Sequence, residues 1–313
     1  MIKGAQASPA LLLSLIRIFP SEIPKKSLDV DDMIKKSTIF AQITKESVLM
    51  RSTKEILSSR RTEHMVKADD IISYMESLRD DAQRVHLMRF FKTGPGEYGE
   101  GDEFLGLKVP RTREVVKLAQ DLPLEQVSPL LMSKWHEIRL CGFLILVDKF
   151  QKLTSRRYVN DEMAIAGRDT ILTLYLDDAD QANNWDLVDL SAPKILGHWL
   201  MLPTRLGNKM DIVDQLAFSN SLWRQRMSMV CTWMTSRLGD PSWCLRYAEI
   251  HLRHSHDLMH KAVGWMLREM GKQVSMDLLR DFLSQHAHEM PRTALRYAIE
   301  KMPDEERQYW MGK

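Results

Sequence analysis

The sequence predicts an all-α protein, and three observations lead to that expectation. Apolar residues recur at helical spacing along most of the 313-residue chain. Glycine and proline are scarce, at 14 and 12 residues, and no stretch alternates apolar and polar residues as a half-buried strand does. The hydrophobic fraction of 44% and the charged fraction of 27% are those of an ordinary globular protein.

Two regions differ in pattern. Residues 1–66 are rich in Lys, Ser and Thr, and we expect an N-terminal extension that is partly helical or loosely ordered, with an apolar helix over 8–19. Residues 67–313 form the main domain, in which short polar connections join successive helices; its longest irregular stretch is TGPGEYGEGDEFLGLKV, 93–109. We expect helices at 68–79, 82–92, 110–121, 123–133, 136–151, 158–176, 185–200, 207–217, 221–237, 241–254, 257–271, 274–286 and 291–302.

Four of these helices share a pattern. Each begins with charged or polar residues and then mixes small with large apolar ones. A period of roughly 30–45 residues of paired helices is typical of a HEAT-like solenoid, whose concave side is an extended binding surface. We therefore expect a C-shaped HEAT-like repeat domain. The four segments are EIRLCGFLIL (137–146), RQRMSMVCTW (224–233), HKAVGWMLRE (260–269) and PRTALRYAIE (291–300).

Unusual side chains recur at this spacing. The stretch NNWDLVD places Trp185 and Asp189 four residues apart on one helical face. Arg226 follows Trp185 by 41 residues, and Trp265 follows Arg226 by 39, so all should line one stretch of a groove. Taken singly, a helical tryptophan is usually core and a helix-start aspartate usually interacts with the helix dipole, a description that suits Asp186 better than Asp189. The coincidence at repeat spacing favours a site.

Charge, cysteine content and the length of the apolar runs indicate which partners and which compartment to expect. The net charge is only +2, but Leu190–Lys272 contains 11 Lys or Arg against 6 Asp or Glu and five of the ten histidines, which indicates either one face made for an anionic partner or a set of solvated helix faces. The three cysteines show no CxxC pattern and are expected to be buried free thiols. The apolar run near residue 10 is too short to span a bilayer. We expect a cytoplasmic protein with no membrane partner.

Other constellations are weak. His256 and His260 are four residues apart, a spacing that suits a metal pair, but no cysteine or HExxH motif supports one, so we expect no metal. The glycine-rich stretch within 93–109 lacks the GK[ST] of a phosphate loop, and no GxSxG or Cys/His pair indicates a nucleophile. We therefore expect no cofactor.

Four stretches together resemble the AlkD family of DNA alkylation repair glycosylases. They are, in order, FFKTGPGEYGEGDEFLGLKVPRTREVVK (90–117), NWDLVD, LWRQRM and KAVGWMLRE, and the similarity runs from about 68 to 302. The resemblance implies HEAT-like repeats that form a basic concave cradle for double-stranded DNA. It also implies hydrolysis of the N-glycosidic bond of positively charged alkylated purines, such as 3-methyladenine and 7-methylguanine, without deep base flipping.

The resemblance assigns roles to particular residues. It implies that Asp189 is the catalytic carboxylate, that Trp185 and Trp265 flank it, and that Arg226 contacts a phosphate. The basic residues on the same helices would bind DNA. The alternative is a HEAT-repeat module that binds DNA or protein without chemistry, and nothing calls for more than a monomer. The expected DNA-binding residues are Arg226, Arg268, Lys261, His260 and Arg224.

Overall fold

The computed structural model describes residues 65–312 of the chain. The chain divides into two units, 1–62 and 63–313. The expected extension over 1–66, with its helix at 8–19, therefore lies almost entirely outside the described residues. Within residues 65–312 no strand forms, apart from an isolated bridge between Glu103 and Trp135, so this unit is all-helical as predicted.

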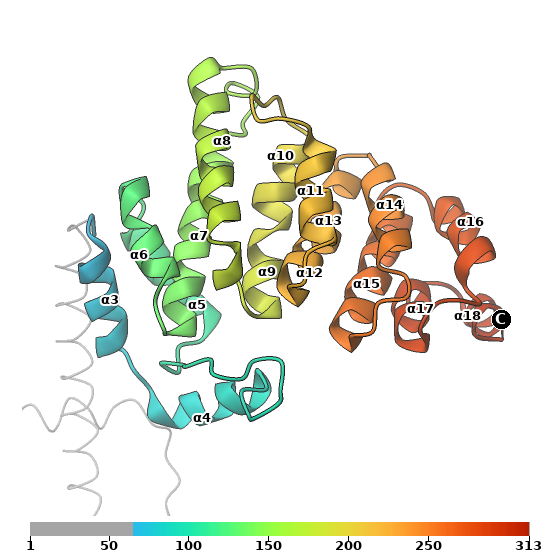
Figure 1. Cartoon of the computed structure of the whole chain (residues 1–313), viewed down its shortest axis with the longest axis horizontal. Helices are drawn as coiled ribbons and strands as arrows, with labels where there is room; N and C mark the ends of the chain where they lie inside the picture. Colours follow the sequence, from blue (N-terminus) through green and yellow to red (C-terminus); the bar gives the residue numbers. More distant parts are fainter. Residues whose placement is uncertain (1–64, 313) are drawn as a thin grey trace, which may run out of the picture. The chain divides into compact units, whose positions relative to one another are not determined.

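Successive helices pack on one another in chain order (Figure 1). A central series, α5, α7, α9, α12, α15 and α17, is continuous because each member contacts the next. The helices are α3 (Ala68–Ser77), α4 (Asp81–Phe90), α5 (Val109–Leu118), α6 (Ser128–Leu131), α7 (His136–Lys152), α8 (Glu162–Asp177), α9 (Trp185–Ser191), α10 (His198–Leu200), α11 (Lys209–Ala217), α12 (Leu222–Val230), α13 (Thr232–Arg237), α14 (Ser242–Ile250), α15 (Asp257–Gln273), α16 (Met276–His286), α17 (Arg292–Ile299) and α18 (Asp304–Met311), with 3₁₀ turns η3 (Leu124–Gln126) and η4 (Ala179–Gln181) and the π-helical turn η5 (Pro193–Gly197).

Side-chain caps fix where the central helices begin. The Asn184 side chain accepts a hydrogen bond from the first amide of α9, and Ser221 accepts one from Arg224 in α12. Asp161 caps α8 in the same way, which is why that helix begins at Glu162 and not at the predicted residue 158. These caps set the phase of each helix and so decide which side chains face the neighbouring helix.

Three predicted helices are interrupted. The one expected over 123–133 divides into the 3₁₀ turn η3 and the short helix α6. The helix expected over 185–200 ends after α9, because Pro193 lacks an amide hydrogen and the chain passes through a π turn in which the Gly197 amide donates to the Ala192 carbonyl at 2.9 Å. The helix expected over 221–237 breaks at Cys231 between α12 and α13. Helix α18 was not predicted, because its charged sequence buries only Trp310 and has no apolar periodicity.

The closest packing in the series is between α15 and α17. A Cβ atom on Gly264 would lie 2.2 Å from the Ala294 carbonyl oxygen, so only glycine lets the two backbones approach this closely. The approach brings α17 beside the face of α15 that carries Trp265.

The three cysteines are free and buried, as expected.

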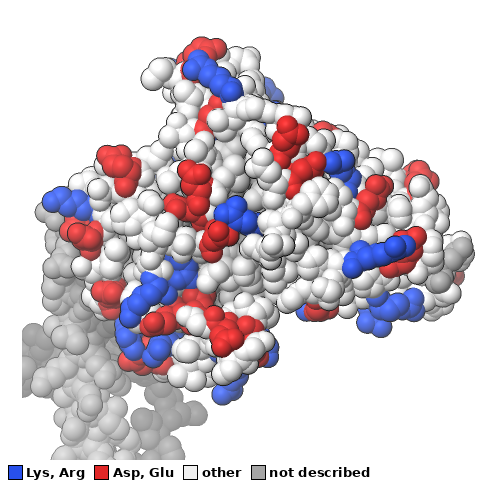
Figure 2. Space-filling view, in the orientation of Figure 1, with Lys and Arg blue, Asp and Glu red and all other residues white. Residues whose placement is uncertain are grey.

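Charges on the surface are mixed. On the face drawn in Figure 2, acidic and basic side chains lie side by side. No helix among residues 65–312 is long and apolar enough to cross a membrane.

Candidate active site

The central helices bring the predicted residues to one cavity of about 380 Å³. Helix α9 supplies Trp185 and Asp189, which its first two turns place on one face. Arg226 comes from α12, and Trp265 comes from α15. The repeat spacing therefore identified side chains that do line one cavity, because the helices that carry them are packed neighbours.

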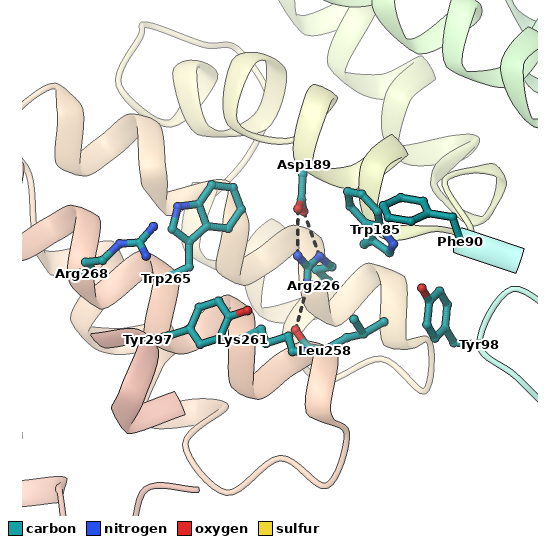
Figure 3. Close-up of a pocket in the computed structure, with 10 residues that line it drawn as sticks. All are labelled: Phe90, Tyr98, Trp185, Asp189, Arg226, Leu258, Lys261, Trp265, Arg268 and Tyr297. Atoms are coloured by element: carbon teal, nitrogen blue, oxygen red, sulfur yellow. Dashed lines mark hydrogen bonds and ion pairs between the residues drawn. The ribbon is translucent and has the colours of Figure 1, made fainter. Parts of the chain in front are cut away.

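Asp189 and Arg226 form a bidentate ion pair within this cavity (Figure 3). Arg226 donates from Nε to Asp189 Oδ1 at 2.9 Å and from Nη2 to Oδ2 at 2.8 Å. Its Nη1 donates to the Leu258 carbonyl at 2.6 Å, at the start of α15. The Arg226 side chain is 5% exposed and therefore nearly sealed, whereas the Asp189 side chain is 15% exposed and retains an edge open to solvent.

The ionisation of Asp189 reflects two opposed effects. Burial raises its pKa, the Arg226 guanidinium lowers it, and the net direction is upward from the ordinary aspartate value. The carboxylate is thus a desolvated charge that depends on one arginine. Charges of this kind interact strongly with any positive charge that forms nearby, because little water screens them.

Aromatic side chains flank the carboxylate. Figure 3 shows Asp189 between Trp265 on one side and Trp185 with Phe90 on the other. Trp185 is held by ring contacts, stacked on Phe91 at 5.3 Å and edge-on to Phe90 at 5.8 Å.

Two tyrosines that sequence reasoning missed also line the cavity, Tyr98 from the 93–109 stretch and Tyr297 from α17. Tyr98 meets Trp223 edge-on at 6.1 Å. Tyr297 lies in PRTALRYAIE, the last of the four similar segments. Its place in that segment is the sequence feature from which it could have been predicted to line the cavity.

The basic residues of the cavity are paired with acids. Lys261 lies 2.7 Å from Asp257, one turn earlier on α15, and this hydrogen bond raises the lysine pKa. Arg268 pairs with Glu300 and with Glu269. Binding of an anion here therefore exchanges existing ion pairs.

Two of the expected DNA-binding residues do not line the cavity. Arg224 instead makes a bidentate pair with Asp180, at 2.7 and 2.9 Å, on a more exposed surface. His260 uses Nε2 to contact the His254 carbonyl, and His256 accepts the Leu258 amide hydrogen as the cap of α15. Among residues 65–312, no group of three or more potential ligands is arranged to hold a metal ion.

A buried charged cluster lies beneath Trp185, and no sequence pattern predicts it. His136 at the start of α7 contacts Asp102 through Nδ1 at 2.7 Å and Asp186 through Nε2 at 2.9 Å. Burial lowers the pKa of His136, but the two carboxylates outweigh burial and raise it to about 9. Phe91 bridges the imidazolium and Trp185, with ring centroids 5.0 and 5.3 Å away. The cluster therefore holds one wall of the cavity.

Glu137 anchors the 93–109 stretch. Its buried carboxylate accepts hydrogen bonds from the amides of Leu105, Gly106 and Leu107 at 2.8, 2.8 and 2.9 Å. Gly106 has a φ of +94°, and a Cβ there would lie 2.1 Å from the Asp80 carbonyl oxygen. The irregular stretch is therefore fixed at its end through backbone contacts.

The sequence model of the DNA alkylation repair enzyme family matches residues 71–302, which include this entire cavity. The chain belongs to the DNA alkylation repair enzyme family. A solved structure described as a predicted DNA alkylation repair enzyme from Enterococcus faecalis is similar in fold, with a TM-score of 0.53 at 15% identity over 72% of this chain and 97% of that chain. No curated protein matches this chain. This DNA alkylation repair family member thus has a DNA-repair function, and DNA as its substrate.

Proposed function

We propose that this DNA alkylation repair family member is a monofunctional glycosylase of the AlkD type. It hydrolyses the N-glycosidic bond of positively charged alkylpurines, 3-methyladenine and 7-methylguanine, in double-stranded DNA. We propose also that its central helices form a HEAT-like, C-shaped cradle. The observation that carries the proposal is Asp189, a desolvated carboxylate with an exposed edge between two indole rings.

The chemistry needs few groups. An alkylated purine is a cation while attached and leaves as a neutral base that takes the bonding electrons, so no strong general acid is required. The sugar becomes oxocarbenium-like, and water then adds to its anomeric carbon and gives up a proton. Asp189 suits both tasks, since it would stabilise the positive sugar and accept a hydrogen bond from the water.

The neighbouring residues would support that carboxylate. Indole faces at Trp185 and Trp265 suit a cationic base, at ~0.5–2 kcal/mol per contact. Arg226 lowers the pKa of Asp189 against the effect of burial and orients the carboxylate through its bidentate pair. A phosphate contact by Arg226 stays a prediction, and it would require one of the three guanidinium contacts to exchange. Lys261 and Arg268 line the cavity, and we propose that they contact the DNA backbone there.

Outside the cavity, we propose that His260 and Arg224 extend the same DNA-binding surface. They lie on α15 and α12, the helices that supply Lys261 and Arg226. The side chain of His260 contacts the His254 carbonyl, and that of Arg224 pairs with Asp180. Contacts of this kind to the backbone would position the duplex without reading its sequence.

Substitution of the carboxylate tests the proposal. Asp189→Asn removes the negative charge, keeps the shape and should lower release of 7-methylguanine from methylated duplex DNA by well over tenfold, with DNA binding mostly retained. Asp180→Asn is the matched control, because Asp180 also forms a bidentate arginine pair but lies outside the cavity. Full base release by the Asp189 variant would refute a glycosylase centred on this residue. Tight binding without release by the unmodified protein would favour the non-catalytic module.

A further inference from the structure

Two tyrosines of the cavity have no part in the chemistry assigned to Asp189 and the two indole rings. Tyr98 comes from the 93–109 stretch, and Tyr297 comes from α17. Figure 3 shows their hydroxyl groups directed into the cavity from opposite sides, with Lys261 of α15 between them in this view. Two phenol groups and one ammonium group therefore face the same space.

The hydroxyl groups of both tyrosines are available to a ligand. Neither Tyr98 Oη nor Tyr297 Oη forms a hydrogen bond with another residue among 65–312, whereas the hydroxyl of Tyr247 donates to Asp214 at 2.9 Å. Tyr297 is 37% exposed, and the ring of Tyr98 is held edge-on to Trp223 at 6.1 Å. Each hydroxyl can donate one hydrogen bond to an acceptor that enters the cavity.

The backbone that carries each tyrosine is closely packed. Tyr98 precedes Gly99, on which a Cβ atom would lie 2.4 Å from the Phe91 carbonyl oxygen. A Cβ atom on Gly264 would lie 2.6 Å from the Tyr297 Cβ, at the close contact of α15 with α17. Groups presented from a fixed backbone bind a ligand at a lower entropic cost than groups on a mobile one.

The charges around the cavity favour an anion. The three cationic residues that line it are Arg226, Lys261 and Arg268, and the one carboxylate is Asp189. The hydrogen bond to Asp257 has the largest effect in raising the pKa of Lys261, and the phenols of Tyr297 and Tyr98 lie near enough to raise it further. Lys261 is therefore a charged ammonium at neutral pH, with a hydroxyl donor on each side. In DNA, the acceptors that suit such a row are the backbone phosphates.

We propose that Tyr98 and Tyr297 donate hydrogen bonds to backbone phosphates of the DNA, on either side of the contact made by Lys261. A hydroxyl binds phosphate without adding positive charge. That property is useful beside Asp189, because a further cation would repel a sugar that becomes positive. The proposal rests on the proposed contact of DNA with this cavity and does not depend on the excision of a base.

Equilibrium binding of the full-length protein to a fluorescein-labelled duplex, measured by anisotropy at several salt concentrations, tests the proposal. The duplex carries one tetrahydrofuran abasic site, which has no base to release. Tyr98→Phe and Tyr297→Phe each remove one hydroxyl and keep the ring, and each should weaken binding by about threefold to tenfold. Neither should change the slope of log affinity against log salt, because no charge is lost, whereas Lys261→Ala should reduce that slope by about one.

A third tyrosine provides the matched control. Tyr309 lies on α18, is 56% exposed and does not line the cavity, so Tyr309→Phe should leave binding unchanged. Full affinity in both Tyr98→Phe and Tyr297→Phe would refute the hydroxyl contacts. Weaker binding by Tyr98→Leu and Tyr297→Leu in that case would show that the rings stack on the DNA instead.

The remaining outcomes separate this proposal from the glycosylase proposal. A reduced salt slope in either phenylalanine variant would mean that the tyrosine acts through a charged neighbour, which overturns a direct contact. If the variants lose affinity as expected but methylated duplex DNA releases no base, the glycosylase proposal fails and the phosphate contacts stand. If base is released and both phenylalanine variants bind like the unmodified protein, the phosphate contacts fail and the glycosylase proposal stands.

Discussion

Removal of Arg226 should expose how far the charge of Asp189 depends on it. Arg226→Ala deletes two hydrogen bonds to Asp189, at 2.9 and 2.8 Å, and a third to the Leu258 carbonyl at 2.6 Å. Breaking a buried ion pair by removing one partner costs about 3–5 kcal/mol. Because the Asp189 side chain remains 15% exposed and water can reach it, we expect the free energy of unfolding to fall by about 2–3 kcal/mol at pH 7.

The stability lost in Arg226→Ala should also depend on pH. Burial already raises the pKa of Asp189 above its unfolded value, and Arg226 opposes that rise, so its removal raises the pKa further. A carboxyl group with a raised folded-state pKa binds its proton more tightly when folded, so the folded variant gains stability as pH falls through that pKa. The difference between the variant and the unmodified protein should therefore narrow on acidification.

Urea unfolding at several pH values measures both effects. Arg224→Ala is the matched control, because Arg224 makes the same bidentate pair with Asp180 at the surface, where such pairs contribute about 0–1 kcal/mol. Adding Asp189→Asn to Arg226→Ala should restore part of the lost stability. Equal, pH-independent losses for the two arginine variants would refute the reasoning.

Three further predictions follow from the same structure. Lys261→Ala should weaken binding to duplex DNA and reduce the slope of log affinity against log salt by about one, and an unchanged slope would place this lysine away from the phosphates. His136, whose pKa is raised to about 9, should stabilise the fold fully below its unfolded pKa, with about 3 kcal/mol lost as pH rises through 9. Urea unfolding from pH 6 to 10 should show this decline, and His136→Asn should flatten it. Gly264→Ala forces a Cβ against the Ala294 carbonyl and should lower the free energy of unfolding by about 1–3 kcal/mol. Gly207→Ala should not lower it, because the added atom meets nothing within 4 Å. Thermal unfolding of both variants measures the difference.

Periodicity was enough to predict most of the helices and several of the residues that line the cavity. Trp185, Asp189, Arg226 and Trp265 recur at the spacing of packed helices, so sequence distance translated directly into spatial proximity. The helices begin at capping residues and end at helix-breaking residues. The apolar pattern continues through Pro193, but the chain forms a π turn there and the predicted helix ends.

Contacts between side chains that do not recur at helical or repeat spacing could not be predicted from the sequence. The pairing of Arg226 with Asp189, rather than with a solvent-exposed partner, depends on side-chain directions across two helices. The Asp102–His136–Asp186 cluster joins segments 34 and 50 residues apart, and no local pattern announces it. A sequence motif cannot show such contacts, because they depend on how the helices pack.

The anchoring of the 93–109 stretch has a consequence for how this region can change. Glu137 binds main-chain amides, which every residue except proline presents, so the contact is indifferent to the identity of the side chains at 105 and 107. Gly106 is constrained, because its backbone conformation and close approach to Asp80 exclude a larger residue. A designer could therefore vary the tyrosine that this loop presents, provided that Glu137, Gly106 and the buried pairs of Asp102 with His136 and Arg139 are kept, together with the constrained glycines at 96, 99 and 101.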